Sequence, residues 1–371
     1  MSSDVVIAAS RLVDGTGSDG PGWLRVRDGV IVERGQGEPT GDVTTRLGAV
    51  VPGFLDMHVH GALGVDFGAL GADPAPAIAA HARRGSTTLV ASLATGPLTA
   101  TADRLRELAP IVHQGGLAGL HLEGPFLSSA RAGAHDRSLL RAPERADLDA
   151  LLTAADGTIA MVTLAPELPG AFEAIAHLVD GGVVVALGHT DASADEVRRA
   201  IDAGATVITH LFNGMPPLHH RHPGLAGVAL TDERVTVELI ADGHHVDDVV
   251  IDLTRRAAGG RLALVSDAMS ATGLGDGRYD LAGSIVDVHD GIAELADGSS
   301  LAGSTTPVGD AVARLLRRGI DLAEVVSVTS AAPARALDRP GHALAVGSPA
   351  DLVEIVDGAV ARVLRGGALV A

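Results

Sequence analysis

The sequence contains no cysteine and no lysine, and these two absences exclude several kinds of chemistry. Without cysteine there is no thiol nucleophile, thiolate zinc site, iron–sulfur cluster or disulfide. Without lysine there is no Schiff base, no pyridoxal phosphate attachment and no P-loop lysine, nor a carbamylated lysine to bridge two metals. Catalysis must therefore depend on the 16 histidines, on carboxylates and hydroxyls, or on bound metals.

Aromatic side chains and positive charge are also scarce. Phe, Trp and Tyr make up 2% of the 371 residues, and 28 basic residues against 46 acidic ones give a net charge of −18. Such a chain offers few stacking platforms and repels phosphate backbones, so we expect no nucleic-acid partner. No run of 18 apolar residues occurs, and the N-terminal segment lacks the pattern of a secretory signal. We therefore expect no membrane partner and a cytoplasmic location.

Both ends of the chain have the pattern of short strands joined by tight turns. Asp28-Gly29 and Asp357-Gly358 are hairpin signals, each between two apolar runs. Chain ends often lie close together in a folded domain. We therefore predict one small β-sandwich domain built from residues 1–50 and 341–371.

The middle of the chain, residues 51–340, alternates short apolar runs with amphipathic stretches. The eight apolar runs lie at 51–57, 87–93, 117–123, 159–165, 183–188, 206–212, 235–241 and 262–267. Helical patterns over 100–113, 193–203 and 246–258 separate several of them. Eight strand–helix repeats with near-continuously apolar strands predict an α/β fold, a (β/α)8 barrel.

A barrel of this type presents its reactive groups at the carboxyl ends of its strands. Six polar side chains stand at the ends of five of the predicted strands: His58, His60, Glu123, His189, His210 and Asp267. His58 and His60 are two residues apart in a strand, so their side chains point the same way. A histidine alone at a strand end is more often structural, but six such groups predict one shared site.

Several histidines with carboxylates and no cysteine suit a borderline divalent ion, with Zn²⁺ or Fe²⁺ favoured. Such an ion, when it keeps an open position, lowers the pKa of its bound water to about 7. A free carboxylate nearby can take that proton and pass it to the leaving group. Asp267 suits this role, since no local histidine accompanies it; its structural alternative is a cap for the segment after Ala268.

Arg221 stands in a loop rich in proline and histidine, from Pro216 to Pro223, just past the sixth predicted strand. This loop is long enough to project over the mouth of a barrel. An arginine fork suits a phosphate dianion, and a local positive charge is needed where the whole chain carries −18. The alternative is an ordinary solvated arginine.

The chain resembles the N-acetylglucosamine-6-phosphate deacetylases, a family within the amidohydrolase superfamily of metal-dependent hydrolases. The resemblance runs from about residue 50 to residue 310. It rests on PGFLDMHVHG, GLHLEGPFLS, RAGAHD, LGHTDA, THLFNGMPPLHHRHPGLAG, IADGHHVD, SDAMSATG and LAGST, which occur in the family's order. HLEGPF and the HLFNGM–RHPGLAG block are specific to the family, whereas the HxH pair indicates only the superfamily.

The resemblance implies roles for particular residues. Glu123, His189 and His210 match the principal metal ligands, and His58 and His60 match an HxH that accompanies a second metal, with Glu123 bridging. The resemblance thus implies one or two ions per subunit, with Zn²⁺ favoured over Fe²⁺, Mn²⁺ or Co²⁺. Asp267 matches the catalytic acid/base, and His135 a catalytic and substrate-contacting histidine. The other positions implied in substrate binding are Ala134, Asn213, Gly214, Arg221, His245, Leu301, Ala302 and Gly303.

The function implied is hydrolysis of N-acetylglucosamine 6-phosphate to glucosamine 6-phosphate and acetate. In relatives, the residue matching Arg221 reaches the neighbouring subunit's site, which implies a homodimer. One alternative is the same reaction on N-acetylgalactosamine 6-phosphate, and a wider one is another amidohydrolase. A third is a non-catalytic barrel that binds sugar phosphates. The third alternative predicts no bound metal and no loss of activity on Asp267→Asn.

Overall fold

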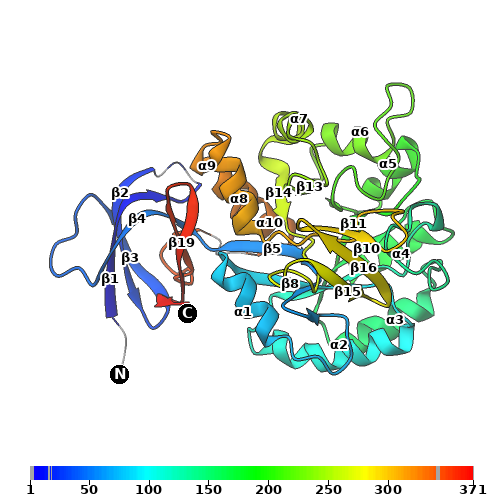
Figure 1. Ribbon diagram of the computed structural model, residues 1–371, viewed down its shortest axis with the longest axis horizontal. Helices are drawn as coiled ribbons and strands as arrows, with labels where there is room; N and C mark the ends of the chain where they lie inside the picture. Colours follow the sequence, from blue (N-terminus) through cyan, green and yellow to red (C-terminus); the bar gives the residue numbers. More distant parts are fainter. Residues whose placement is uncertain (1–3, 16, 18, 340–342, 371) are drawn as a thin grey trace. The chain divides into compact units, whose positions relative to one another are not determined.

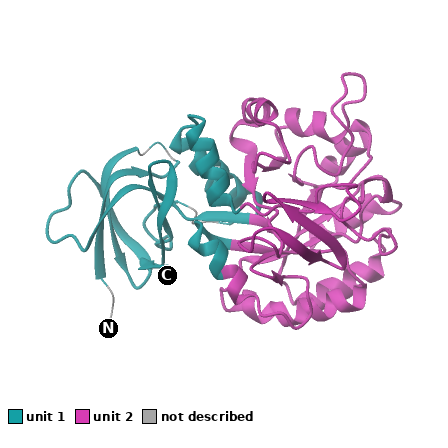
Figure 2. Ribbon diagram, viewed as in Figure 1, with its two compact units in different colours: residues 1–56, 79–88, 307–371 teal, residues 57–78, 89–306 magenta. Residues whose placement is uncertain are grey.

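The computed structural model describes residues 4–15, 17, 19–339 and 343–370. By its internal contacts the chain divides into two compact units, shown in Figures 1 and 2. The first comprises Met1–Asp56, Ala79–Thr88 and Pro307–Ala371, and the second comprises Met57–Ile78 and Leu89–Thr306. All the site residues predicted from the sequence belong to the second unit. Within the described residues, no helix is both long enough and apolar enough to span a bilayer.

In the first unit, both ends of the chain contribute strands to one seven-stranded sheet, in the order β20-β19-β18-β4-β1-β2-β3. The strands are β1 (Asp4–Val13), β2 (Asp19–Arg27), β3 (Val30–Gln36), β4 (Thr45–Pro52), β18 (Leu352–Val356), β19 (Ala359–Arg365) and β20 (Ala368–Leu369). Apolar residues from six of these strands, including Leu24, Ile31, Val50 and Leu352, pack into one buried core, so the sheet curves around it. The prediction of a small β domain built from both chain ends is confirmed. Its boundaries at residues 50 and 341 stay a prediction.

The predicted barrel is confirmed: eight parallel strands form one sheet in the order β14-β13-β12-β11-β10-β9-β8-β5. They are β5 (Phe54–Val59), β8 (Ser86–Ala94), β9 (Gly119–Glu123), β10 (Ile159–Leu164), β11 (Val184–Leu187), β12 (Val207–Ile208), β13 (Thr236–Ile240) and β14 (Leu262–Val265). Strand interiors such as Val90, Leu120 and Leu239 are buried because other elements cover both faces. The Asp267 amide donates to the His58 carbonyl at 2.9 Å and the His60 amide to the Ala268 carbonyl at 2.8 Å, which joins the first strand to the last.

Helices follow the strands in the expected alternation (Figure 1). They are α1 (Ala75–Arg83), α2 (Leu98–His113), α3 (Arg145–Ala155), α4 (Ala171–Asp180), α5 (Ala194–Asp202), α6 (Gly224–Thr231), α7 (Asp248–Ala258), α8 (Val308–Arg317), α9 (Leu322–Val326) and α10 (Ala332–Ala336). Local signals fix several of their starts. Ser193 and Glu196 form a reciprocal capping box on α5, and the Asp247 carboxylate accepts from the Val249 amide at the start of α7.

Two small sheets are inserted between barrel elements, and the sequence analysis did not predict them. One pairs β6 (Gly61–Ala62) with β7 (Val65–Asp66). The other is an antiparallel sheet of β15 (Gly277–Leu281), β16 (Ser284–His289) and β17 (Ile292–Leu295), which stands after the last barrel strand. Its inner side chains pack on the segment after β14, which places this sheet beside the carboxyl end of the barrel.

Candidate active site

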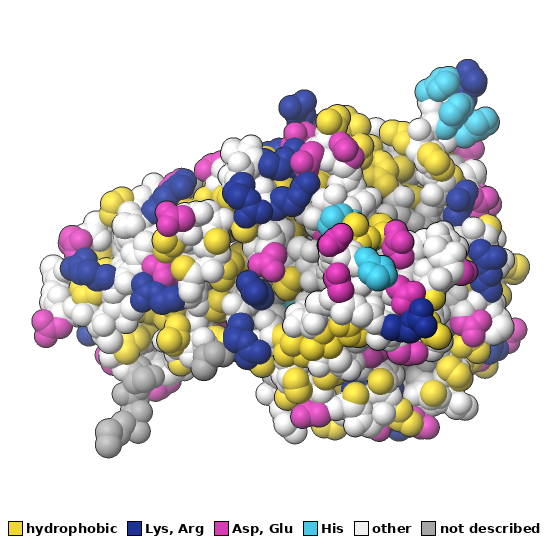
Figure 3. Space-filling model, viewed as in Figure 1, with side chains coloured by type: hydrophobic (Ala, Val, Ile, Leu, Met, Phe, Trp, Pro, Cys, Tyr) yellow, Lys and Arg dark blue, Asp and Glu magenta, His cyan; other side chains and the backbone are white. Residues whose placement is uncertain are grey.

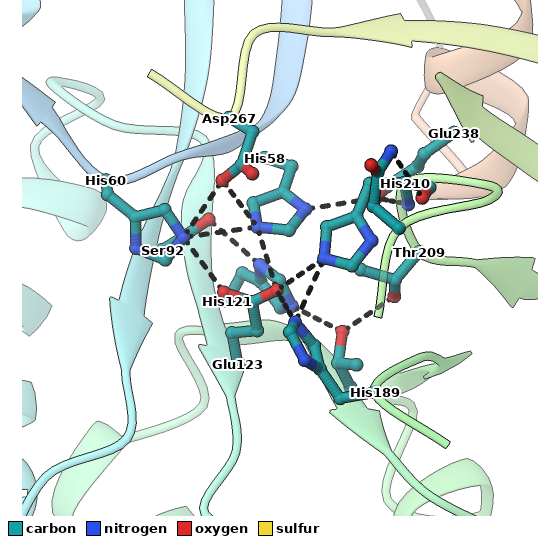
Figure 4. Close-up of polar contacts among 12 residues, drawn as sticks. His58, His60, Ser92, His121, Glu123, His189, Thr209, His210, Glu238 and Asp267 are labelled. Atoms are coloured by element: carbon teal, nitrogen blue, oxygen red, sulfur yellow. Dashed lines mark hydrogen bonds and ion pairs between the residues drawn. The ribbon is translucent and has the colours of Figure 1, made fainter. Parts of the chain in front are cut away.

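Six side chains from the carboxyl ends of the barrel strands converge on one buried centre (Figure 4). Their side chains are at most 11% exposed, and the set is His58, His60, Glu123, His189, His210 and Asp267. Each stands within two residues of the end of its strand, as the sequence pattern predicts. The structure thus brings together residues that lie up to 209 positions apart along the chain, from His58 to Asp267.

The backbone turns sharply at three of these residues. Their φ angles are 46° at His189, 25° at His210 and 48° at Asp267, in a region that residues other than glycine seldom occupy. Each follows its strand after one intervening residue, so the turn swings the side chain over the barrel mouth. A Cβ on the preceding Gly188 would lie 2.6 Å from the Thr209 Cβ, so only glycine fits beside that neighbour. Such costly conformations persist where a site requires them.

Glu123 is the centre of the cluster. Its Oε1 lies 3.2 Å from His189 Nε2, 3.1 Å from His210 Nε2 and 3.4 Å from His58 Nε2. Its Oε2 lies 3.0 Å from His60 Nε2. The six residues therefore form two groups of potential metal ligands that share one carboxylate. The first group is Glu123, His189 and His210, and the second is His58, His60, Glu123 and Asp267.

The imidazole contacts show that these residues fit a divalent cation. His189 Nδ1 lies 2.8 Å from the carbonyl oxygen of Arg131, which can only accept, so Nδ1 carries the proton in the neutral ring. The lone pair on Nε2 then faces the Glu123 carboxylate and His210 Nε2, the latter at 3.1 Å. Lone pairs and a carboxylate directed at one point repel one another unless a cation lies between them. Histidine nitrogen with carboxylate oxygen and no thiolate suits Zn²⁺ or a similar ion.

Asp267 stands at the edge of the second group. Its Oδ1 lies 3.3 Å from His60 Nε2 and 3.4 Å from His58 Nε2. Burial alone would raise the pKa of Asp267, but the imidazoles of His58 and His60 outweigh it and lower the pKa to about 2. Burial likewise opposes ionisation of Glu123, yet His58 and the other imidazoles around it hold its pKa well below the usual range. Both carboxyl groups are therefore ionised at neutral pH, and Asp267 is available to accept a proton.

His135 also contacts Glu123, with its Nε2 3.5 Å from Oε2 of that carboxylate. Its Nδ1 accepts a hydrogen bond from the Thr95 amide at 3.3 Å, so the proton of the neutral ring is on Nε2. Burial lowers the pKa of His135 to about 4 against the opposing effect of Glu123. His135 is thus a neutral imidazole that directs an N–H donor into the site.

A cavity of about 200 Å³ opens above this centre. Most of the predicted substrate-binding residues line it, namely Ala134, His135, Asn213, Gly214, His245, Leu301 and Gly303. Leu281, Ala282 and Ser300 also line it, and the sequence analysis missed them. Ala302 does not line the cavity, because it is fully buried in the apolar core beneath the β15–β17 sheet.

Arg221 does not line the cavity of its own chain. It is exposed in the loop between β12 and α6, with His219, His220 and His222 around it. Figure 3 shows histidine and basic side chains gathered at the tip of a protruding segment, the loop that Figure 1 draws in green above α5 and α6.

His245 and Asp242 form a nearly buried ion pair at the cavity wall. His245 Nδ1 lies 2.6 Å from Asp242 Oδ2, and Asp242 Oδ1 accepts from the amides of His244 and His245. Burial would lower the pKa of His245, but its hydrogen bond to Asp242 raises it above the usual value. The same contact holds the pKa of Asp242 well below its usual range, although burial acts in the other direction. Asp242 therefore favours the protonated form of the His245 ring at the cavity wall.

This pair makes the stability of the chain depend on pH. The contribution of Asp242 is complete above its unfolded pKa of about 3.9 and is lost as the pH falls. The contribution of His245 is complete below its unfolded pKa of about 6.5 and is lost as the pH rises through the raised folded value. Asp242→Asn keeps an oxygen for the two backbone amides but removes the charge.

We expect Asp242→Asn to lower the free energy of unfolding by about 2 kcal/mol at pH 5.5. At pH 9 the wild-type chain has less of the contribution of His245 than at pH 5.5, because this contribution falls as the pH rises above the unfolded pKa. The variant should therefore differ less from the wild type at pH 9. Thermal denaturation of both proteins at the two pH values measures this difference. An equal loss of stability at pH 5.5 and pH 9 would show that the ion pair does not titrate as described.

A second layer of buried polar residues lies beneath the ligand groups, and its members had no predicted role. Glu238 on β13 contacts His58, with Oε2 3.0 Å from Nδ1. His121 lies between the hydroxyls of Ser92 and Thr163, at 2.9 and 2.8 Å. The sequence holds one signal for Glu238, its place inside the apolar run at 235–241. A carboxylate there is buried away from water and needs a polar partner.

Known proteins are similar to this chain in sequence and in fold. Residues 49–370 match the Amidohydrolase family. The chain is 40% identical to an N-acetylgalactosamine-6-phosphate deacetylase from Escherichia coli O157:H7, over 91% of this chain and 90% of that protein. It is 34% identical to an N-acetylglucosamine-6-phosphate deacetylase from Bacillus subtilis strain 168, over 90% and 88% of the two chains.

A solved structure is similar over its whole length. It is a mutant N-acetyl-D-glucosamine-6-phosphate deacetylase from Mycobacterium smegmatis in complex with N-acetyl-D-glucosamine-6-phosphate, with a TM-score of 0.96, 43% sequence identity and 100% of both chains covered. The family match spans most of the chain, and the ligand groups described above stand at the barrel positions where a metal-dependent hydrolase needs them. The chain belongs to the amidohydrolase family.

Proposed function

We propose that this protein is a metal-dependent deacetylase that hydrolyses N-acetylglucosamine 6-phosphate to glucosamine 6-phosphate and acetate. The observation that carries the proposal is the pair of ligand groups that share Glu123, with the carboxylate of Asp267 at the edge of the second group. The names of the relatives and of the similar structure supply the substrate class, an amino-sugar 6-phosphate. The cavity above the centre is lined near the ligands by several polar side chains, among them His135, Asn213 and His245, which suit the hydroxyls and phosphate of such a sugar.

Glu123, His189 and His210 would hold one divalent cation, and His58 and His60 with Glu123 would hold a second. When bound, such an ion polarises a carbonyl and acidifies water. We favour Zn²⁺, with Fe²⁺, Mn²⁺ or Co²⁺ as alternatives, since the donors are nitrogen and carboxylate oxygen.

Asp267 is the acid and base of the proposed reaction. Its ionised carboxylate accepts a proton from the attacking water, whose oxygen forms a bond to the acetyl carbon. Asp267 then donates that proton to the amide nitrogen, the C–N bond breaks, and acetate and the free amine leave. His135, with its proton on Nε2, donates a hydrogen bond to the acetyl oxygen as negative charge develops there.

Residues further out in the cavity would hold the sugar and its phosphate. Asn213 is fixed because its side-chain amide donates to the carbonyls of His210 and Leu211, both at 3.3 Å. His245 lines the same space, and its ring, whose pKa Asp242 raises, suits a hydroxyl or phosphate oxygen. These residues position the substrate, and holding it in one orientation lowers the barrier to reaction.

Arg221 would complete the site of a neighbouring subunit, so the proposed enzyme is a homodimer. Its exposed position on a projecting loop supports this role, because the side chain is free to reach a second copy. A guanidinium fork matches a phosphate dianion. We place the enzyme in the cytoplasm, since a doubly charged sugar phosphate does not cross a bilayer unaided.

We expect Arg221→Ala to raise KM for N-acetylglucosamine 6-phosphate about 100-fold, because a charge-assisted contact contributes about 1.5–3 kcal/mol. KM for unphosphorylated N-acetylglucosamine should change little. Steady-state assays of acetate release from both sugars give the comparison, and His220→Ala is the matched change in the same loop. A similar rise for both sugars would mean that Arg221 does not bind the phosphate.

The proposed function is tested by metal analysis of the purified protein and by acetate release from two epimers. N-Acetylgalactosamine 6-phosphate is a second candidate substrate, since the 40% identical relative from E. coli is named for it. The main proposal predicts a higher kcat/KM for the glucosamine derivative. A higher value for the galactosamine derivative would favour the second candidate. No turnover of either sugar with Zn²⁺, Fe²⁺, Mn²⁺ or Co²⁺ supplied would reject both.

A further inference from the structure

The proposed reaction makes no use of Glu238, although this carboxylate lies directly beneath the metal ligands. Glu238 is fully buried in the middle of β13. Its Oε2 lies 3.0 Å from His58 Nδ1 and accepts from the His210 amide at 3.3 Å (Figure 4). Burying a charged carboxylate is costly unless it is paired, so a carboxylate at this place indicates a specific role.

Glu238 fixes the orientation and the tautomer of His58. An ionised carboxylate only accepts hydrogen bonds, so the neutral ring of His58 carries its proton on Nδ1. The lone pair on Nε2 then points to the site centre, where Nε2 lies 3.2 Å from His60 Nε2 and 3.4 Å from Oδ1 of Asp267. A carboxylate behind an imidazole also makes that imidazole a stronger metal ligand.

The other candidate histidine ligands have no such partner. His189 Nδ1 faces a neutral backbone carbonyl, that of Arg131. His60 Nδ1 and His210 Nδ1 are buried without a hydrogen-bond partner among the described residues. Among the candidate histidine ligands that the structure describes, only His58 therefore has a carboxylate at its Nδ1, on the side away from the site centre. His58 belongs to the second ligand group alone.

The Glu238 carboxylate also favours the binding of a cation to the second ligand group. Two cations side by side repel each other, and the ligands of the pair carry only two carboxylates, Glu123 and Asp267. Glu238 adds a third buried negative charge one imidazole away from the second group. Its contact with His210 is to the backbone amide, so it does not act on the ligand nitrogen of the first group.

We propose that Glu238 is a positioning residue that orients His58 and thereby controls whether a second divalent cation binds to the group formed by His58, His60, Glu123 and Asp267. This inference rests on the proposed metal-dependent function and adds to it a determinant of how many ions the site holds. Removing an outer partner of this kind costs about 10–100-fold in metal affinity.

The test measures metal binding directly and needs no turnover. The metal-free full-length protein is titrated with Co²⁺, with calorimetry for affinity and stoichiometry and the visible absorption spectrum for coordination. The wild type should bind two ions per chain. Glu238→Leu should weaken the second ion about 10–100-fold and leave the affinity for the first ion unchanged. Glu238→Gln keeps an oxygen acceptor for Nδ1 but not the charge, so its effect should be intermediate.

A double-mutant cycle assigns the effect to one group. His60→Asn should abolish the second ion, and adding Glu238→Gln to His60→Asn should then leave the affinity for the remaining ion unchanged. Thr163→Val is the matched control, because it removes two buried hydrogen bonds in the same layer, to His121 and Thr209, and neither partner is a candidate ligand. It should lower the melting temperature and leave both affinities as in the wild type.

The outcomes separate this inference from the proposed function. Equal two-ion affinities in Glu238→Leu, Glu238→Gln and the wild type would overturn the role of Glu238 alone. The same conclusion would follow if the wild type bound one ion, or if the Glu238 variants lost both ions equally. A wild type that binds no divalent cation would overturn the proposed function as well. If Glu238→Leu does not fold, the Glu238→Gln titration and the cycle still decide the question.

Discussion

Asp267→Asn is expected to lower kcat for acetate release by about 10³-fold, because one residue supplies both the proton acceptor and the proton donor. The asparagine side chain has nearly the same size and keeps one oxygen, so the local packing should be unchanged. KM should stay within a few-fold of the wild-type value, since Asp267 lines the cavity at the ligand centre and the proposed contacts to the sugar and its phosphate come from other residues. Steady-state assays of the purified variant measure both constants.

Two controls make the result specific to proton transfer. Asp267→Asn should still bind the metal ion of the first group, because that group does not include Asp267. Its melting temperature should not fall. A variant that keeps more than a tenth of the wild-type kcat would show that another group transfers the proton.

Glu123→Gln is expected to remove both metal ions and all measurable activity. Glu123 is the single carboxylate common to both ligand groups, and it lies within 3.5 Å of five imidazoles. Gln is a poor metal ligand and brings an N–H₂ group into a centre built for a cation. We expect the affinity for Zn²⁺ to fall by more than about 100-fold, beyond the effect of an outer partner.

The matched control for this change is Glu354→Gln in the terminal sheet. Glu354 is also almost fully buried and paired, in its case with Arg362, but it belongs to the first unit. Glu354→Gln should lower the melting temperature while metal content and acetate release stay as in the wild type. If Glu123→Gln kept its metal, the shared carboxylate would not be a ligand and the assignment of the centre would be wrong.

The barrel and its metal-facing residues could be predicted because they depend on short-range rules. Strands buried on both faces must be apolar, and their parallel arrangement sends every carboxyl end to one rim. A histidine or carboxylate at the carboxyl end of such a strand therefore lies at that rim. For this reason the sequence pattern alone predicts that His189 and Asp267, far apart along the chain, lie at the same rim.

Other features could not be predicted because they depend on the pairing of distant segments. The β15–β17 sheet had a local signal, the Asp290-Gly291 turn between β16 and β17, but nothing in its sequence shows that it packs beside the barrel mouth. The resemblance implied that the backbone at 301–303 flanks the substrate, but nothing in the sequence shows that the side chain of Ala302 is buried against this sheet. Glu238 was missed because its contact with His58 spans 180 positions along the chain.

Arg221 shows a second reason why part of the site could not be predicted from the sequence. The loop that carries it was expected to project, and in the structure Arg221 is exposed on it. The partner that we propose for Arg221 belongs to a second copy of the chain. Sequence spacing describes one copy, so a contact between two copies leaves no trace in it. The KM comparison for Arg221→Ala therefore tests what neither the spacing nor one subunit can reveal.

The central claim is that imidazoles and carboxylates at the barrel mouth hold a divalent cation on which hydrolysis depends. Its most direct test is acetate release from N-acetylglucosamine 6-phosphate, measured as chelator-treated protein is titrated with Zn²⁺. We predict no activity in the stripped protein and a rise in rate in proportion to bound Zn²⁺, reaching a plateau when the ligand groups are filled. Acetate release that is unaffected by stripping, or absent at full occupancy with each of the four ions, would contradict it.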